Sequence, residues 1–253
     1  MSVGYTPMLE QYRAIKQQHA DEILFFRLGD FYEMFFDDAL LASKELEITL
    51  TSRDGGQDQR IPMCGVPYHA AESYIAKLIS KGYKVAICEQ VEDPKQAKGL
   101  VRREVIKIIT PGTVISETLL PDANNNFLAV LYEEADCLVL GAADISTGEC
   151  IWAQAAGPNR MNAICDHLIR LLPSELLIVG KISDLSLLKN FLASRLPNCL
   201  CSPFSIDDIE KIRQLPRQHF EDLPDNHLCL TVIGCLLHYL HTTLKADLSH
   251  LNR

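Results

Sequence analysis

The chain has 253 residues, a formal net charge of −9 at pH 7, and 47% hydrophobic and 23% charged residues. That length suits two domains better than one. No apolar run reaches the roughly 18 residues of a membrane span, and the amino terminus lacks the apolar core of a signal peptide, so we expect a cytoplasmic protein. The negative charge by itself argues against nucleic acid as a partner.

The first part of the chain predicts a mixed α/β domain. Helices are expected at residues 5–19, 38–46 and 70–81, and strands at 23–28, 31–36, 47–52, 84–89 and 101–110. Residues 53–60 (RDGGQDQR) predict a loop, and residues 62–67 a stiff, turn-rich connection. The breaker at 111–113 and the polar run LPDANNN at 120–126 indicate a boundary. We therefore expect a domain over residues 1–115, a linker over 116–126 and a second domain over 127–253.

The second part begins with three expected strands, at residues 127–132, 137–144 and 149–154. Alternating helices and strands then follow at residues 159–172, 175–179, 184–192, 199–202 and 206–213, before a last helix at 228–244. Three leading strands followed by alternating helices and strands is the order of a ribonuclease-H-like α/β layer fold.

The most informative segment is ILFFRLGDFYEMFFDDA at residues 23–39. In extended backbone, residues two apart point the same way, so Phe31 and Glu33 would present an aromatic ring and a carboxylate on one face. Such a pair can read nucleic acid, the ring wedging between bases and the carboxylate bonding to a base edge. The alternative is that Phe31 is ordinary strand core and Glu33 its solvated neighbour.

A basic segment at residues 95–107 holds Lys95, Lys98, Arg102, Arg103 and Lys107 against a single acidic residue. It could contact phosphates, or it could be a solvated loop and strand edge. The nine cysteines contain no C-x-x-C pair and lie mostly in apolar stretches, which predicts free, reduced thiols and no metal site.

One constellation predicts a different function. In ribonuclease-H-like enzymes an Asp on the first strand joins other carboxylates to hold two metal ions that activate water. Asp144 could take that part, with Glu175 and Asp207 or Asp208 as partners. The rival hypothesis is therefore a metal-dependent nuclease. The chain has no G-x-x-x-x-G-K-[ST] phosphate loop, no G-x-S-x-G and no H-E-x-x-H.

Several ordered segments together resemble the bacterial MutS family of DNA mismatch-repair proteins. They are Thr6-Pro7-Met8 with Gln11-Tyr12, the segment at 23–39, IPMCGVPYHA at 61–70, KLISKGYKVAICEQVEDP at 77–94, AKGLVRREVIKIITPGT at 97–113, and the DISTGE turn at 144–149. The resemblance runs through nearly the whole chain. It implies a mismatch-recognition domain followed by a ribonuclease-H-like connector domain without nuclease activity.

The resemblance also implies roles for individual residues. Phe31 would insert and stack on a mispaired base, Glu33 would hydrogen-bond that base, and Arg53 and Arg103 would contact the DNA backbone. Family members continue into further domains, including an ATPase that uses ATP and Mg, so this chain would be an amino-terminal fragment that is not an enzyme and has no cofactor of its own. The implied partners are mismatched duplex DNA, MutL and, in the full-length protein, a second copy.

Overall fold

The first half of the chain forms a six-stranded sheet whose strands lie in the order β3-β4-β2-β1-β5-β6. The strands are β1 (Glu22–Leu28), β2 (Phe31–Phe35), β3 (Thr51–Gly56), β4 (Gln59–Pro67), β5 (Lys84–Gln90) and β6 (Arg103–Ile109). Strands β1 and β5 are parallel, and every other neighbouring pair is antiparallel. The computed structural model describes residues 4–56, 59–92, 99–114, 125–220 and 223–245.

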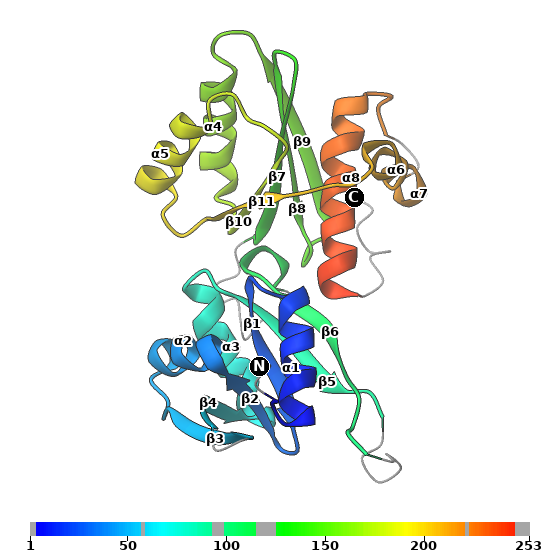
Figure 1. Ribbon diagram of the computed structural model, residues 1–253. Helices are drawn as coiled ribbons and strands as arrows, with labels where there is room; N and C mark the ends of the chain where they lie inside the picture. Colours follow the sequence, from blue (N-terminus) through cyan, green and yellow to red (C-terminus); the bar gives the residue numbers. More distant parts are fainter. Residues whose placement is uncertain (1–3, 57–58, 93–98, 115–124, 221–222, 246–253) are drawn as a thin grey trace. The chain divides into compact units, whose positions relative to one another are not determined.

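Helices cover both faces of this sheet (Figure 1). Helix α1 (Pro7–Gln18) packs on one face, where its Leu9 and Tyr12 join a buried cluster with Phe26, Phe35 and strand residues of β4, β5 and β6. Helices α2 (Phe36–Leu46) and α3 (Ala71–Ser80) pack on the other face. A single 3-10 turn, η1 (Tyr68–Ala70), connects β4 to α3. The mixed α/β domain expected from the sequence is confirmed.

Three local expectations in this domain are wrong. Residues 47–50 are not a strand, and the loop expected at 53–60 is largely a hairpin, with β3 running to Gly56 and β4 beginning at Gln59. The connection expected at 62–67 is part of β4, because β4 pairs with β2 along its length, from Met63 opposite Phe35 to Pro67 opposite Phe31. Pairing with a distant strand overrides the local turn signals of the glycines and prolines.

The second half of the chain forms a five-stranded sheet in the order β11-β10-β7-β8-β9. Its strands are β7 (Phe127–Glu134), β8 (Cys137–Asp144), β9 (Glu149–Ala156), β10 (Glu175–Val179) and β11 (Leu200–Phe204). The first three strands are antiparallel to one another, while β10 runs parallel to β7 and β11 parallel to β10. This is the ribonuclease-H-like order that the sequence predicts.

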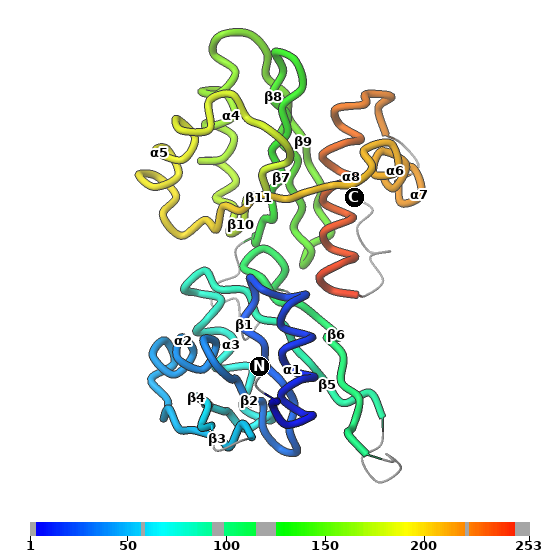
Figure 2. The backbone as a smooth tube through the Cα atoms, viewed as in Figure 1, coloured from blue at the N-terminus to red at the C-terminus, as the bar shows by residue number. Residues whose placement is uncertain are grey.

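Helices lie on both faces of this second sheet, as the tube in Figure 2 also shows. Helices α4 (Arg160–Leu171) and α5 (Leu185–Arg195) pack on one face, and α8 (His227–Leu244) packs on the other. The short helices α6 (Ile209–Gln214) and α7 (Pro216–His219) pack against α8. A 3-10 turn, η2 (Pro111–Thr113), precedes β7 and contacts β7 and β10. The chain divides between Thr110 and Pro111, and most of the linker expected at 116–126 lies outside the described residues.

Helix α8 begins where the side chain of Asn226 accepts hydrogen bonds from the backbone N–H groups of Leu228 and Cys229. Among the described residues it is the one helix long and apolar enough to cross a membrane, but 78% of its length is buried inside the second unit. A helix that is apolar on all sides belongs in a protein core when sheet and helices surround it. We therefore describe α8 as a core helix.

The nine cysteines are all free thiols. Burial raises the pKa of several of them, to about 12 for Cys64, Cys88 and Cys235. A thiol with such a pKa carries almost no thiolate at neutral pH and is a poor nucleophile or metal ligand. These cysteines therefore serve as small apolar core residues.

Gly234 of α8 leaves no room for a side chain. A Cβ added there would overlap the backbone carbonyl of Ile212 in α6. A backbone carbonyl cannot rotate away as the end of a flexible side chain can. We expect Gly234→Ala to lower the free energy of unfolding by about 1–3 kcal/mol, because overpacking outweighs the gain in helix propensity. Urea unfolding monitored by the fluorescence of the single tryptophan, Trp152 in β9, measures it.

Thr242→Ala is the matched control, because Thr242 lies on the exposed side of the same helix. It should change the free energy of unfolding by no more than about 0.5 kcal/mol. Equal transitions for Gly234→Ala and the original protein would contradict the close packing of α6 on α8.

Candidate nucleic-acid interface

The turn between β1 and β2 is held from two directions. Gly29 has a φ of +58°, a conformation that glycine adopts easily. The guanidinium Nε of Arg27 donates to the carbonyl of Gly29 at 2.5 Å, and the backbone N–H of Tyr68 donates to the carbonyl of Asp30 at 2.9 Å. These bonds set the point at which β2 begins, with Phe31 directly opposite Leu28.

Strand β2 divides its side chains between the two faces of the sheet. Tyr32 and Met34 are buried on the face that α2 and α3 cover, while Phe31, Glu33 and Phe35 point to the face that carries α1. Phe35 is fully buried in the cluster under α1, but Phe31, at the start of the strand, is 46% exposed. The expectation that Phe31 and Glu33 share one face is confirmed, and Phe31 is not enclosed in the core.

Glu33 is paired with Arg53. The Nη1 atom of Arg53 donates to the Oε2 atom of Glu33 at 2.6 Å. The sequence places Arg53 in a loop after a strand, whereas the structure places it inside β3, two strands away from β2 and on the same face of the sheet. Sequence reasoning names both residues but does not bring them together.

The pKa of Glu33 reflects two opposing effects. Partial burial raises the pKa of its carboxyl, and the nearby guanidinium of Arg53 lowers it through charge and hydrogen bonding; burial is the larger effect, so the pKa lies above that of an ordinary glutamate. A carboxyl in this position accepts a proton at a higher pH than one in water. It is therefore suited to serve either as an acceptor or, once protonated, as a donor.

Arg103 lies in the interior of the domain and not on its surface. Only 7% of the residue is exposed. Its guanidinium donates to the carbonyls of Arg27 and Val101 at 2.7 and 2.8 Å and to the Oε1 atom of Gln11 at 3.1 Å, and it lies over the ring of Phe26 at 5.0 Å. These contacts tie β6 to β1 and α1. A contact to a DNA phosphate would need the guanidinium to leave all of them.

The other described basic residues of the segment at 95–107 differ from Arg103 in their exposure. Lys95 and Lys98 lie outside the described residues. Arg102 and Lys107 are exposed, and Arg102 forms an ion pair with Glu104. Of the two readings of this segment, the described part fits a strand edge with one inward-facing arginine.

A second set of side chains that sequence reasoning missed lies on the opposite face of the sheet, behind the β1–β2 turn. The guanidinium of Arg27 lies 3.7 Å from the ring centroid of Tyr68 and 3.4 Å from the carboxylate of Glu89, which also accepts a hydrogen bond from Tyr32. Because Arg27 also donates a hydrogen bond to the carbonyl of Gly29, this network stabilises the turn that precedes Phe31. Its members lie on four different segments of the chain, so no local sequence pattern predicts that they meet.

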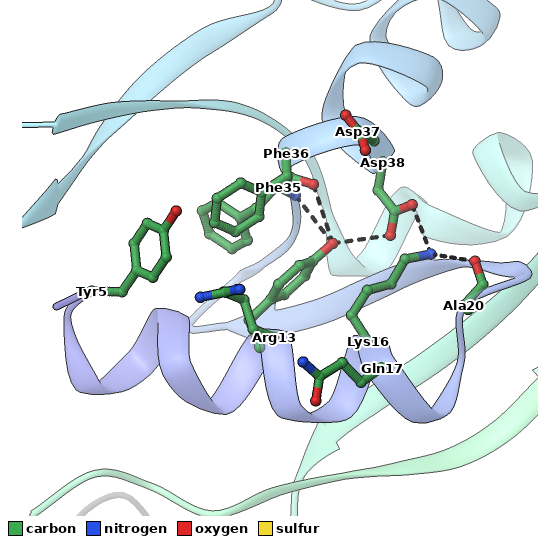
Figure 3. A pocket seen from close by; sticks show the side chains of 10 residues that line it. Tyr5, Arg13, Lys16, Gln17, Ala20, Phe35, Phe36, Asp37 and Asp38 are labelled. Atoms are coloured by element: carbon green, nitrogen blue, oxygen red, sulfur yellow. Dashed lines mark hydrogen bonds and ion pairs between the residues drawn. The ribbon is translucent and has the colours of Figure 1, made fainter. Parts of the chain in front are cut away.

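A cavity of about 440 Å³ lies between α1 and the start of α2. Figure 3 shows Lys16 and Asp38 at this cavity, where the ammonium of Lys16 lies 2.9 Å from the carboxylate of Asp38. The hydroxyl of Tyr12 donates to the same carboxylate at 2.9 Å. Burial, and next the charge of Asp38, raise the pKa of Tyr12 far above its usual value. The backbone N–H of Leu24 also donates to Asp38 at 2.9 Å. These groups satisfy one another and join α1 and α2 to the sheet, so we interpret the network as structural.

The carboxylates of the nuclease hypothesis are engaged in holding the second fold together. Asp144 is fully buried and accepts hydrogen bonds from the backbone N–H groups of Asn126 and Ser146 and from the Ser146 hydroxyl. Glu175 is fully buried and accepts from the N–H of Gly112 and the hydroxyl of Tyr239.

The other two candidates of that hypothesis, Asp207 and Asp208, are exposed, and Asp208 caps α6. Within the described ranges, no group of three or more His, Cys, Asp or Glu side chains could hold a metal ion. The arrangement therefore does not fit two-metal nuclease chemistry.

Comparison with known proteins matches the two units of the chain to two domains of one family. Residues 6–118 match the family model described as MutS domain I, and residues 126–252 match MutS domain II. These are two α/β domains of one family, and the chain belongs to the MutS family.

Curated relatives carry the name DNA mismatch repair protein MutS. The one from Ruminiclostridium cellulolyticum is 45% identical over 254 residues, which cover 98% of this chain and 29% of the relative. The one from Syntrophomonas wolfei is 58% identical over 176 residues, covering 70% of this chain and 20% of the relative. The one from Caldanaerobacter subterraneus is 43% identical over 262 residues, covering all of this chain and 30% of the relative. The chain thus spans less than a third of the length of these relatives.

The buried position of Arg103 leads to a stability prediction. Arg103→Met keeps a long apolar stem over Phe26 but removes the hydrogen bonds that the guanidinium donates to Arg27, Val101 and Gln11, so we expect the free energy of unfolding to fall by about 1–3 kcal/mol. Arg102→Met, at the exposed neighbouring position, is the matched control and should change it by no more than about 0.5 kcal/mol. Urea unfolding with hydrogen exchange of the β1 and β6 amides measures both. Equal stability of the two variants would show that the guanidinium of Arg103 is not needed in the interior.

Proposed function

We propose that this chain recognises mispaired or looped-out bases in duplex DNA and so takes part in DNA mismatch repair. The observation that carries the proposal is the half-exposed ring of Phe31 at the start of β2, on the same face as the carboxylate of Glu33. Membership of the MutS family and the name of the curated relatives, DNA mismatch repair protein MutS, support it.

Phe31 acts as a wedge in this proposal. A mispaired base is already poorly stacked, so opening that step costs less than opening a matched step, where unstacking costs about a few kcal/mol. The ring stands at the start of β2, and Tyr32, Met34 and Phe35 farther along the strand are buried, so the ring can enter the duplex without disturbing the domain. Discrimination then comes from the deformability of the DNA and not from reading a sequence.

Glu33 supplies the contact to the base. A carboxylate near phosphates is electrostatically unfavourable, so it must gain from a specific hydrogen bond, or take up a proton and donate to an acceptor such as a purine N7. The raised pKa of Glu33 makes the protonated form easier to reach. We propose Arg53, which is partly exposed beside Glu33, as a contact to the DNA backbone. For Arg103 we propose a positioning role, because its guanidinium is buried under α1.

We propose that the second unit is a connector without nuclease activity and a docking surface for MutL, and that the protein acts in the cytoplasm as a homodimer. These two domains carry out no catalysis and need no cofactor in this proposal. We propose that ATP and Mg are used by an ATPase domain of the full-length family proteins; this chain contains no phosphate-binding loop of the G-x-x-x-x-G-K-[ST] type.

The wedge role predicts the behaviour of Phe31→Ala. We expect the ratio of affinities for mismatched over matched duplex to fall to near one, while binding to matched duplex is retained, because phosphate contacts do not involve the ring. Fluorescence anisotropy with paired oligonucleotides that differ by one base measures it. Ile106→Ala is the control, since Ile106 is a similarly exposed apolar strand residue on β6. A mutant ratio equal to that of the original protein would refute the wedge.

The contact of Glu33 predicts a pH dependence. Where the carboxyl must donate, the mismatch preference of the original protein falls as the pH rises through the raised pKa of Glu33, because the donating proton is lost. Glu33→Gln carries a permanent N–H donor, so it should keep binding and show a preference that does not change with pH. Affinities for both duplexes at several pH values and salt concentrations measure it. The same pH profile in both proteins would exclude proton donation by Glu33.

A further inference from the structure

The strand between β2 and β3 makes the pairing of Glu33 with Arg53 possible. Strand β4 separates them, so the two side chains must meet across it. The residue of β4 directly opposite Glu33 is Gly65. A Cβ built on Gly65 would lie 3.4 Å from the Cγ of Glu33 and 3.2 Å from the carbonyl oxygen of Tyr32. Because Gly65 has no side chain, the side chain of Glu33 can lie over the backbone of β4 at this position.

Arg53 completes the arrangement from the far side. It stands opposite Ile61 of β4, and its guanidinium reaches back to the carboxylate of Glu33 with an N···O distance of 2.6 Å. The side chain of Glu33 is only 17% exposed in this position, whereas Phe31, two residues earlier on the same face, is about half exposed. The ring is presented to solvent and the carboxylate is held down against the sheet.

We infer that Arg53 is a positioning residue that latches Glu33 over Gly65 in the DNA-free protein, and that the latch must open before Glu33 can bond a base. This inference rests on the proposed function. A mispaired base offers Glu33 a new partner and so opens the latch, whereas a matched duplex offers none and leaves it closed. The ion pair therefore subtracts from the affinity for mismatched DNA and not from the affinity for matched DNA.

The surroundings of Glu33 make Arg53 the dominant charged neighbour. On β1 the residue opposite Glu33 is Phe26, and on β4 it is Gly65. Arg103 lies on the same face beyond Phe26, where it bonds backbone carbonyls and Gln11. Arg27 and its partner Glu89 lie on the opposite face of the sheet. A change at Arg53 should therefore act on Glu33 more than a change at any other of these residues.

The latch makes a prediction for Arg53→Gln that a simple phosphate contact does not. Loss of the positive charge lowers the affinity for both duplexes, but release of Glu33 raises the ratio of mismatched over matched affinity by about twofold to fivefold, the range of partly exposed ion pairs. In a Glu33→Gln background, Arg53→Gln should leave the ratio unchanged, because the charged pair is already gone. Anisotropy titrations with the four proteins of this cycle measure the coupling.

A second measurement needs no DNA. Carbon-detected NMR of the Glu33 carboxyl should show its pKa rising in Arg53→Gln and partly restored in Arg53→Lys. Arg60→Gln is the matched control, since Arg60 lies on the neighbouring strand β4 and bonds Ser52 instead of Glu33. A pKa of Glu33 that is the same in Arg53→Gln and Arg60→Gln would show that the pair does not form in solution and would overturn the inference.

The outcomes separate the latch from the proposed function. If Arg53→Gln weakens both duplexes equally with an unchanged ratio, Arg53 is a phosphate contact only, and the latch is wrong. In that case Phe31→Ala still abolishes the mismatch preference if the proposed function is right. If Phe31→Ala also leaves the ratio unchanged, the proposed function itself fails.

Discussion

The alternation of side chains along five residues of β2 is the constraint on which the candidate interface depends. Tyr32 and Met34 must enter the core under α2 and α3, and Phe35 must enter the core under α1. With these three fixed, Phe31 and Glu33 can only lie on the α1 face, Phe31 at the start of the strand and Glu33 at its middle. A slip of one residue would bury the ring and expose Tyr32. The free-energy cost of exposing the core side chains therefore fixes the register of β2 and with it the positions of Phe31 and Glu33.

Features that depend on local alternation or period could be predicted from the sequence, and features that depend on distant pairing could not. The shared face of Phe31 and Glu33 and the strand order of the second unit follow from alternation and element order. The meeting of Arg53 with Glu33 depends on the register of β3 and β4 against β2, for which the sequence at 53–67 shows only turn signals. The burial of Arg103 depends on Gln11, 92 residues away.

The second unit has the strand order of a ribonuclease-H-like fold, but two carboxylates named by the nuclease hypothesis are hydrogen-bonded within that fold. A two-metal site needs carboxylates that converge on a space open to substrate and water. Here Asp144 and Glu175 point their oxygens at N–H and O–H donors of their own domain. Buried carboxylates with hydrogen bonds of this kind stabilise the turns around them, and removing the donors would leave costly unpaired charges. The oxygens of Asp144 and Glu175 are thus used to hold their own domain together.

A protein with a net charge of −9 must bring a duplex close to an acidic side chain for the proposed function to work. The pairing of Glu33 with Arg53 addresses that problem locally, because the pair is neutral as a whole and does not repel an approaching phosphate. Charge separation is then needed only when the carboxylate leaves the arginine, which frees the guanidinium for a phosphate at the same moment. On this argument the carboxylate becomes available only after the duplex has arrived, and the base that receives it is the one that Phe31 has already displaced.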